Sequence, residues 1–377
     1  MSDYPAVRTL MGPGPSDIHP RVLQALARPT IGHLDPQFVA LMDKVKVLLR
    51  YAFKTENPLT MAVSAPGSAG METCFTNLME PGDKVLVCIN GVFGKRMLEN
   101  VTRLGGIPVV LEFPWGEAVD PAKVEQALKA DSEIAIVAFV HAETSTGVCS
   151  DPKPIADLAR QHDCLTIVDT VTGLGGIELD VDGWGLDAVY SGSQKCLSCV
   201  PGLSPVTFND RAIAKIKART HPVPSWFLDL TLVMDYWLDS EGTGGKRAYH
   251  HTAPVNSIYA LHESLVMLKN EGLENSWQRH AAMHQKLAQG LEALGLELIV
   301  DSSIRLPQLN LVKIPEGIDD AAFRKQLLEK YNLEIGAGLG AFAGKAWRIG
   351  LMGYAAREEN IQLCLGAIKE TLAEMRS

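Results

Sequence analysis

Cys164-Leu-Thr-Ile-Val-Asp169 and Asp187-Ala-Val-Tyr-Ser-Gly192 are two short runs, and Lys195 follows the second of them. Both are mostly apolar on both faces, which is typical of strands in a parallel sheet that helices cover on both sides. Similar runs surround them at 84–89, 107–113, 134–140 and 204–208. Helical patterns such as 151–162 separate these runs. The sequence therefore predicts an α/β fold made of βαβ units.

The remaining sequence divides around this series. Its 377 residues suit one large domain and one smaller domain. Residues 1–16 include Gly12-Pro-Gly-Pro15 and are expected to form an extended arm. We expect the large domain over 17–257 and a small α+β domain over 258–377. Beyond the central series, helical patterns lie at 36–53, 257–294, 319–330 and 358–375, and strand-like runs at 296–301, 309–314 and 346–352.

Composition narrows the range of functions. The net charge of −9 argues against a nucleic-acid or anionic-membrane surface, since both attract clustered Lys and Arg. The N-terminus lacks a signal-peptide pattern, and no apolar run approaches the ~20 residues of a membrane span. We therefore expect a cytoplasmic location. The odd count of 7 cysteines predicts reduced thiols, and Cys196-x-x-Cys199 has no second ligand pair that would indicate a metal site.

Several polar residues lie where the chemistry of such a sheet takes place, beyond the carboxyl ends of its strands. Asp169 could hold a protonated pyridine nitrogen or cap a turn. Lys195 could form a Schiff base or lie at the surface. The turn Ala65-Pro-Gly-Ser-Ala-Gly70 opens a helix and could present N–H groups to a phosphate. Arg348 could bind a substrate carboxylate or form an internal salt bridge.

The order of these residues resembles the class V, fold-type I enzymes that use pyridoxal 5'-phosphate (PLP), in particular the alanine–glyoxylate and serine–pyruvate aminotransferases. The resemblance extends from Gly12 to Tyr354. The most specific matching segments are Val168-Asp-Thr170, Ser191-Gly-Ser-Gln-Lys-Cys196, His141-Ala-Glu-Thr-Ser-Thr-Gly147, Tyr249-His-His-Thr252 and Glu271-Gly-Leu-Glu-Asn-Ser-Trp277.

The resemblance implies a role for each matching residue. Lys195 would form the Schiff base with PLP, and Asp169 would hold the pyridine nitrogen. Phe93 would stack on the ring, where the mammalian-type members have Trp, and Ser68 stands where they have His. The further residues implied to contact the cofactor are Gly67, Ala69, Thr144, Val171 and Gln194.

Other matching residues concern the substrate and a second subunit. Arg348 would bind the substrate α-carboxylate, and Gly32-His33 would shape the pocket for the amino-acid side chain. Tyr249 and Thr252 match residues that reach the phosphate in the neighbouring subunit. The resemblance thus implies a homodimer with shared active sites.

The activity implied is transamination from alanine or serine to glyoxylate or pyruvate, in two half-reactions through pyridoxamine phosphate. A ureidoglycine–glyoxylate aminotransferase is the nearest alternative, although relatives of that kind have Gln at the position of His33. A cysteine desulfurase would need a mobile Cys in the terminal domain, and 332–346 contains none. A PLP-fold protein without catalysis would have lost Lys195, Asp169 or Arg348. A nicotinamide-dependent reductase would need G-x-G-x-x-G after its first strand.

Overall fold

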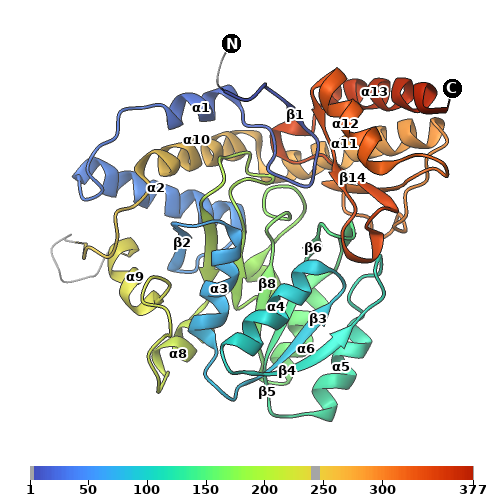
Figure 1. Cartoon of the computed structure of the whole chain (residues 1–377). Coiled ribbons are helices and arrows are strands. Elements are labelled where there is room, and N and C mark those ends of the chain that lie inside the picture. Colours follow the sequence, from blue (N-terminus) through green and yellow to red (C-terminus); the bar gives the residue numbers. More distant parts are fainter. Residues whose placement is uncertain (1–3, 239–246, 377) are drawn as a thin grey trace.

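The computed structural model describes residues 4–238 and 247–376, and it confirms the α/β fold with a mostly parallel sheet (Figure 1). Seven strands form this sheet in the order β2-β10-β9-β8-β5-β3-β4. Strand β10 is antiparallel to both of its neighbours, and the other neighbouring pairs are parallel. The strands are β2 (Leu59–Val63), β3 (Lys84–Ile89), β4 (Ile107–Glu112), β5 (Ile134–Val140), β8 (Leu165–Asp169), β9 (Ala188–Tyr190) and β10 (Ser204–Phe208).

Strand β2 was not predicted. Its sequence, Leu-Thr-Met-Ala-Val, carries few β-branched residues and begins six residues after the last residue of α2. It lies at an edge of the sheet and pairs only with the antiparallel β10. All five of its residues are nevertheless buried, because helices cover both faces there.

The helices around the sheet begin with recognisable sequence signals. Helices α2, α5 and α6 each start at an Asp-Pro pair, in which the Asp side chain accepts a hydrogen bond from the amide two residues later. Proline suits the first helical position because its missing N–H would have no partner there. Helices of this part are α1 (Pro20–Leu26), α2 (Pro36–Phe53), α3 (Gly67–Leu78), α4 (Val92–Arg103), α5 (Pro121–Ala130), α6 (Pro152–Gln161), α7 (Val181–Trp184), α8 (Asp210–Lys217) and α9 (Leu230–Trp237).

The C-terminal part contains a three-stranded antiparallel sheet in the order β11-β14-β13. The predicted helical region 257–294 is two helices, because Gly272 (φ 88°) separates α10 from α11. The predicted strand at 296–301 is wrong: these residues form one isolated bridge, between Leu298 and Val312. The elements are α10 (Val255–Glu271), α11 (Leu273–Ala293), β11 (Leu309–Lys313), α12 (Asp320–Tyr331), β12 (Leu333–Glu334), β13 (Gly336–Ala337), β14 (Ala346–Gly350) and α13 (Glu358–Arg376).

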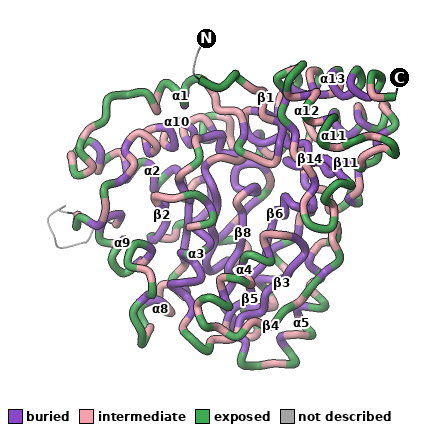
Figure 2. The backbone as a smooth tube through the Cα atoms, in the orientation of Figure 1, coloured by how far each residue is buried: buried purple, intermediate pink, exposed green. Residues whose placement is uncertain are grey.

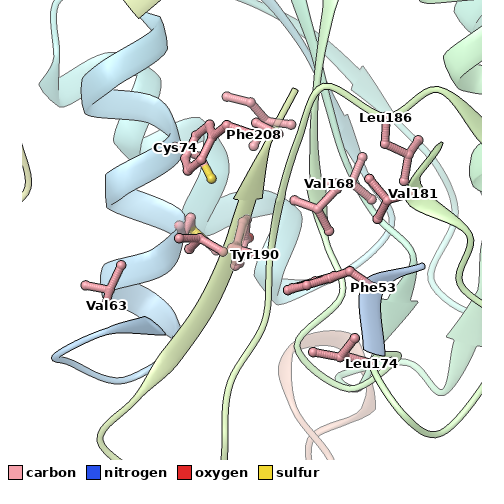
Figure 3. Close-up of a cluster of buried hydrophobic side chains, with 14 of the residues drawn as sticks. Phe53, Val63, Cys74, Val168, Leu174, Val181, Leu186, Tyr190 and Phe208 are labelled. Carbon is pink, nitrogen blue, oxygen red and sulfur yellow. The ribbon is translucent and has the colours of Figure 1, made fainter. Parts of the chain in front are cut away.

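Buried residues form two main clusters. Figure 2 marks the buried stretches of the backbone in purple. The first surrounds the large sheet, where Figure 3 shows Phe53 of α2, Cys74 of α3 and Tyr190 of β9. The second lies among α11, α12, α13 and β14. Helix α10 contributes to the first cluster, and the domain border at residue 258 stays a prediction.

The N-terminal arm connects the two clusters. Its strand β1 (Thr9–Leu10) pairs in parallel with β12, and Met11 is buried in the second cluster. The arm then continues to Gly14 and Ser16 beside Lys195. Among the described helices, none is long and apolar enough to cross a bilayer.

Candidate active site

Asp169 is the last residue of β8 and is buried. Its carboxylate accepts hydrogen bonds from the Val171 amide (2.8 Å) and from the Tyr190 hydroxyl (2.8 Å). Burial raises the pKa of Asp169 to about 6, although these two bonds favour the charged form. A cationic ring nitrogen beside the carboxylate would oppose the effect of burial. The sequence did not point to Tyr190. This residue ends β9 and pairs with Asp169 of the neighbouring strand β8, and this position could have indicated its role.

Lys195 lies in the turn after β9 and points toward the N-terminal arm. Its Nζ donates a hydrogen bond to the Pro13 carbonyl, and Ser16 Oγ donates to the Lys195 carbonyl (2.8 Å). Gly14 has φ 99° and lies so close that a Cβ atom there would overlap the lysine side chain. Burial lowers the pKa of Lys195 to about 8, so the amine is more easily neutral than an exposed lysine.

Asp169, Lys195 and the start of α3 line a cavity of about 180 Å³. Its wall brings together eight of the predicted cofactor residues. These are Gly67, Ser68, Phe93, Thr144, Asp169, Val171, Gln194 and Lys195. The residues therefore converge although they come from five separate segments of the chain.

The cavity wall combines groups that fit a phosphorylated pyridine. Helix α3 begins at this wall without a side-chain cap, which leaves amides of its first turn for an anion. Gln194 is also part of the wall, and its buried Oε1 has no hydrogen-bond partner among the described residues. The Asp169 carboxylate lines the same cavity. The Ala69 amide donates instead to the Pro66 carbonyl (2.7 Å), and its predicted phosphate contact stays a prediction.

Sequence analysis also missed Met71 and Arg96, which line this cavity. Arg96 is exposed at the cavity wall, and its guanidinium carbon lies 4.9 Å from the centre of the Phe93 ring. The three-residue spacing of Phe93 and Arg96 within α4 could have indicated this, because residues so spaced share one helix face.

Arg348 lies in β14 and is 8% exposed. Its Nε donates to the Ala337 carbonyl (2.7 Å) and its Nη1 to the Thr144 carbonyl (3.4 Å). Among residues 4–238 and 247–376, no carboxylate forms an ion pair with it, so the salt-bridge alternative is not realised. Burial lowers the pKa of Arg348 to about 10, and the charge of Glu143 opposes this. The guanidinium can therefore still accept a carboxylate.

The remaining predicted residues do not line this cavity. Gly32, His33, Tyr249 and Thr252 lie together elsewhere, with the His33 and Tyr249 rings 5.2 Å apart. The Tyr236 hydroxyl donates to the His33 carbonyl (3.0 Å). Tyr249 is 61% exposed, and Gly32 and Thr252 are exposed as well. We call these four residues the surface cluster.

Comparisons with known proteins give one family. Residues 15–363 match the family model described as Aminotransferase class-V. The chain is 40% identical to the alanine–glyoxylate aminotransferase of Rattus norvegicus, over 97% of this chain and 87% of that protein. It is 37% identical to the (S)-ureidoglycine–glyoxylate transaminase of Bacillus subtilis, over 97% and 91%. The crystal structure of an alanine–glyoxylate aminotransferase from Nostoc sp. superposes with a TM-score of 0.95 at 45% identity, covering 99% of this chain and 97% of that one.

Proposed function

The chain belongs to the class-V aminotransferases, and we propose that it uses PLP to move the amino group of alanine or serine to glyoxylate or pyruvate. One observation carries the proposal: Lys195, Asp169 and the uncapped start of α3 face one cavity, and Arg348 donates to the Thr144 carbonyl of its wall without an ion pair among the described residues. A lysine, a carboxylate and an anion site are what a phosphorylated pyridine aldehyde requires. The alanine–glyoxylate aminotransferases among its relatives support alanine as donor and glyoxylate as acceptor.

PLP, when bound, supplies an electron sink for the negative charge left after the substrate Cα loses its proton. Asp169 would hold a proton on the ring nitrogen, and the Tyr190 hydroxyl and Val171 amide keep its carboxylate in place. Ser68, Gln194 and the first amides of α3 would bind the phosphate. Phe93 offers an aromatic face to the ring.

The substrate would be oriented by Arg348. Its planar guanidinium matches both oxygens of an α-carboxylate, which fixes the amino acid relative to the cavity. Lys195 Nζ would accept the Cα proton of the bound amino acid. Because burial holds the pKa of this amine near 8, a useful fraction is neutral at physiological pH.

A second candidate function is transamination from ureidoglycine to glyoxylate. The ureidoglycine–glyoxylate transaminase of Bacillus subtilis matches 97% of this chain. His33 belongs to the surface cluster, where its Nε2 is buried without a partner. A desulfurase function is disfavoured because Cys364 is buried in α13 and the loop before β14 has no cysteine.

We also infer a homodimer in the cytoplasm. Trp226 (63% exposed) stacks on His250, and Tyr249 (61% exposed) immediately precedes His250 in the chain. Such neighbouring exposed aromatic side chains favour a covered surface. The seven cysteines are free thiols, which suits a reducing compartment.

The test is a substrate panel. Purified protein supplied with PLP is assayed with alanine, serine and ureidoglycine as donors, and with glyoxylate and pyruvate as acceptors. We expect a PLP-dependent visible absorbance that bleaches on adding alanine or serine, and turnover with glyoxylate. Preference for ureidoglycine would establish the second candidate instead. A protein that binds no PLP would show the proposal to be wrong.

A further inference from the structure

Helix α4 is capped by residues from a distant segment. Its own N-cap residue, Gly91, has no side chain to accept a hydrogen bond. The Val92 amide donates instead to Ser145 Oγ (2.9 Å), and the Phe93 amide donates to Glu143 Oε2 (3.1 Å). The Glu143 carboxylate lies at the positive end of the helix dipole, where a negative charge is stabilised.

Gly91 is required by this close approach. A Cβ atom there would lie 2.5 Å from Glu143 Cγ and 2.5 Å from Ser145 Oγ, closer than unbonded atoms allow. The φ angle of Gly91 is 177°, an extended conformation that any residue can adopt. The glycine is thus explained by the space that Glu143 and Ser145 occupy.

Glu143 is fully buried, and its two oxygens are both used. Oε1 accepts bonds from the Ser145 amide (3.0 Å) and Ser145 Oγ (2.6 Å), while Oε2 accepts the bond from Phe93. Four donors in two segments are therefore held by one carboxylate and one hydroxyl. A buried carboxylate without such donors would be costly.

Glu143 is linked to three residues of the candidate site. Its carboxylate accepts a hydrogen bond from the Phe93 amide. The next residue in the chain is Thr144, whose carbonyl accepts a hydrogen bond from Arg348. The Glu143 carboxylate also lies close enough to Arg348 for its charge to raise the pKa of the guanidinium. No contact ion pair joins these two side chains in the described structure. Glu143 therefore influences Arg348 through its field.

We propose that Glu143 is a positioning residue: its carboxylate caps α4 and so places Phe93, and its negative charge moderates the hold of Arg348 on the substrate carboxylate. The inference rests on the proposed function. Glu143 would not touch the substrate.

The ionisation of Glu143 supports this role. Burial raises its pKa to about 7, and the negative charge of Asp169 acts in the same direction, while Ser145 and Phe93 act against both. The other titratable groups that feel its charge are Arg348 and Tyr190. Protonation would remove the negative charge that strengthens the hydrogen bonds from Phe93 and Ser145. The hydrogen bonds that cap α4 are therefore strongest when Glu143 is ionised.

Three variants separate the cap from the charge. Glu143→Gln keeps the size but removes the charge and replaces one acceptor with a donor. Glu143→Asp keeps the charge but withdraws the oxygens by one methylene. Ser145→Ala keeps the Glu143 carboxyl group but removes the acceptor for Val92 and one donor to Glu143 Oε1.

We measure the PLP dissociation constant by absorbance titration of the apoprotein, and kcat and KM for alanine against pH. In E143Q we expect PLP affinity to fall about tenfold, the size of one hydrogen bond to a charged group. We expect kcat to fall while KM for alanine falls or stays constant, because the Arg348 charge is less compensated. The rise of KM through pH 7 in the natural protein should vanish in E143Q and persist in E143D. In S145A it should move to higher pH, because the lost Ser145 hydroxyl no longer favours the ionised carboxylate.

Proportional rises of KM in all three variants would overturn the charge role, and unchanged PLP affinity in E143Q and E143D would overturn the cap role. If E143Q does not fold, E143D and S145A still test the cap, and the pH dependence of KM in the natural protein still tests the charge. If the natural protein binds PLP but transaminates no donor, the proposed function fails while the PLP affinities still test the cap.

Discussion

The Lys195 cavity and the surface cluster contain residues predicted by the same resemblance, yet they have opposite surroundings. Most residues of the cavity are buried or half-buried, and they converge from β8, α3, α4 and the turn after β9. Residues of the surface cluster are mostly exposed and do not line the cavity. The first group lies within one chain. The second lies at the surface, where we propose that a neighbouring subunit covers it.

The largest effect should come from the centre of the cavity. We expect Lys195→Ala to reduce alanine turnover by at least about a thousandfold, because it removes both the covalent attachment and the proposed base. Loss of the visible absorbance of the PLP-loaded protein is the second measurement. Lys153→Ala is the control, since Lys153 is half exposed and pairs with Asp157 on α6. Equal activity of the two variants would show that Lys195 is not a catalytic residue.

The next effect concerns Arg348 at the side of the cavity. Arg348→Lys keeps a positive charge but loses the planar fork, and Arg348→Ala loses both. We expect kcat/KM for alanine to fall about tenfold in the first and about a hundredfold in the second, as for a bidentate carboxylate contact. PLP affinity should stay nearly constant. A parallel loss of PLP affinity would indicate that Arg348 acts on the fold instead.

The pH dependence of PLP uptake tests the burial of Lys195. Only the neutral amine attacks the aldehyde, and burial lowers the pKa of Lys195 to about 8. Uptake by the apoprotein should therefore rise about tenfold per pH unit below 8 and level off above it, as expected for a single ionisation. Stopped-flow absorbance measures the rate. A rise that continues to pH 10 would mean that the amine titrates like an exposed lysine.

The smallest expected effect on PLP binding comes from a change in the surface cluster. It also tests most directly whether this cluster serves a neighbouring subunit. Thr252→Ala should weaken PLP binding about fivefold, the size of one hydrogen bond. If active sites are shared, a mixed dimer of the Lys195→Ala and Thr252→Ala chains contains one intact site. We therefore expect mixing to produce sites of natural PLP affinity. Mixed dimers without such sites would show that Thr252 acts within its own chain.

Much of the fold could be predicted because it depends on local patterns. The strands 84–89 and 204–208 have the predicted bounds. The helix predicted at 36–53 has its bounds because an Asp-Pro pair starts it and Lys54 ends it in the left-handed conformation. Strand β2 and the irregular 296–301 were mistaken because their formation depends on partners rather than on their own residues.

The sequence alone determined the family and most of the strands along the chain, and it predicted Lys195, Asp169 and Arg348 as site residues. It could do so because strand composition and ordered motifs are local properties. The tertiary structure decided that Tyr190 supports Asp169, that Arg348 has no ion pair in the described chain, and that Glu143 caps a helix 50 residues away. Contacts between distant segments depend on how the sheet assembles, which no short stretch of residues encodes.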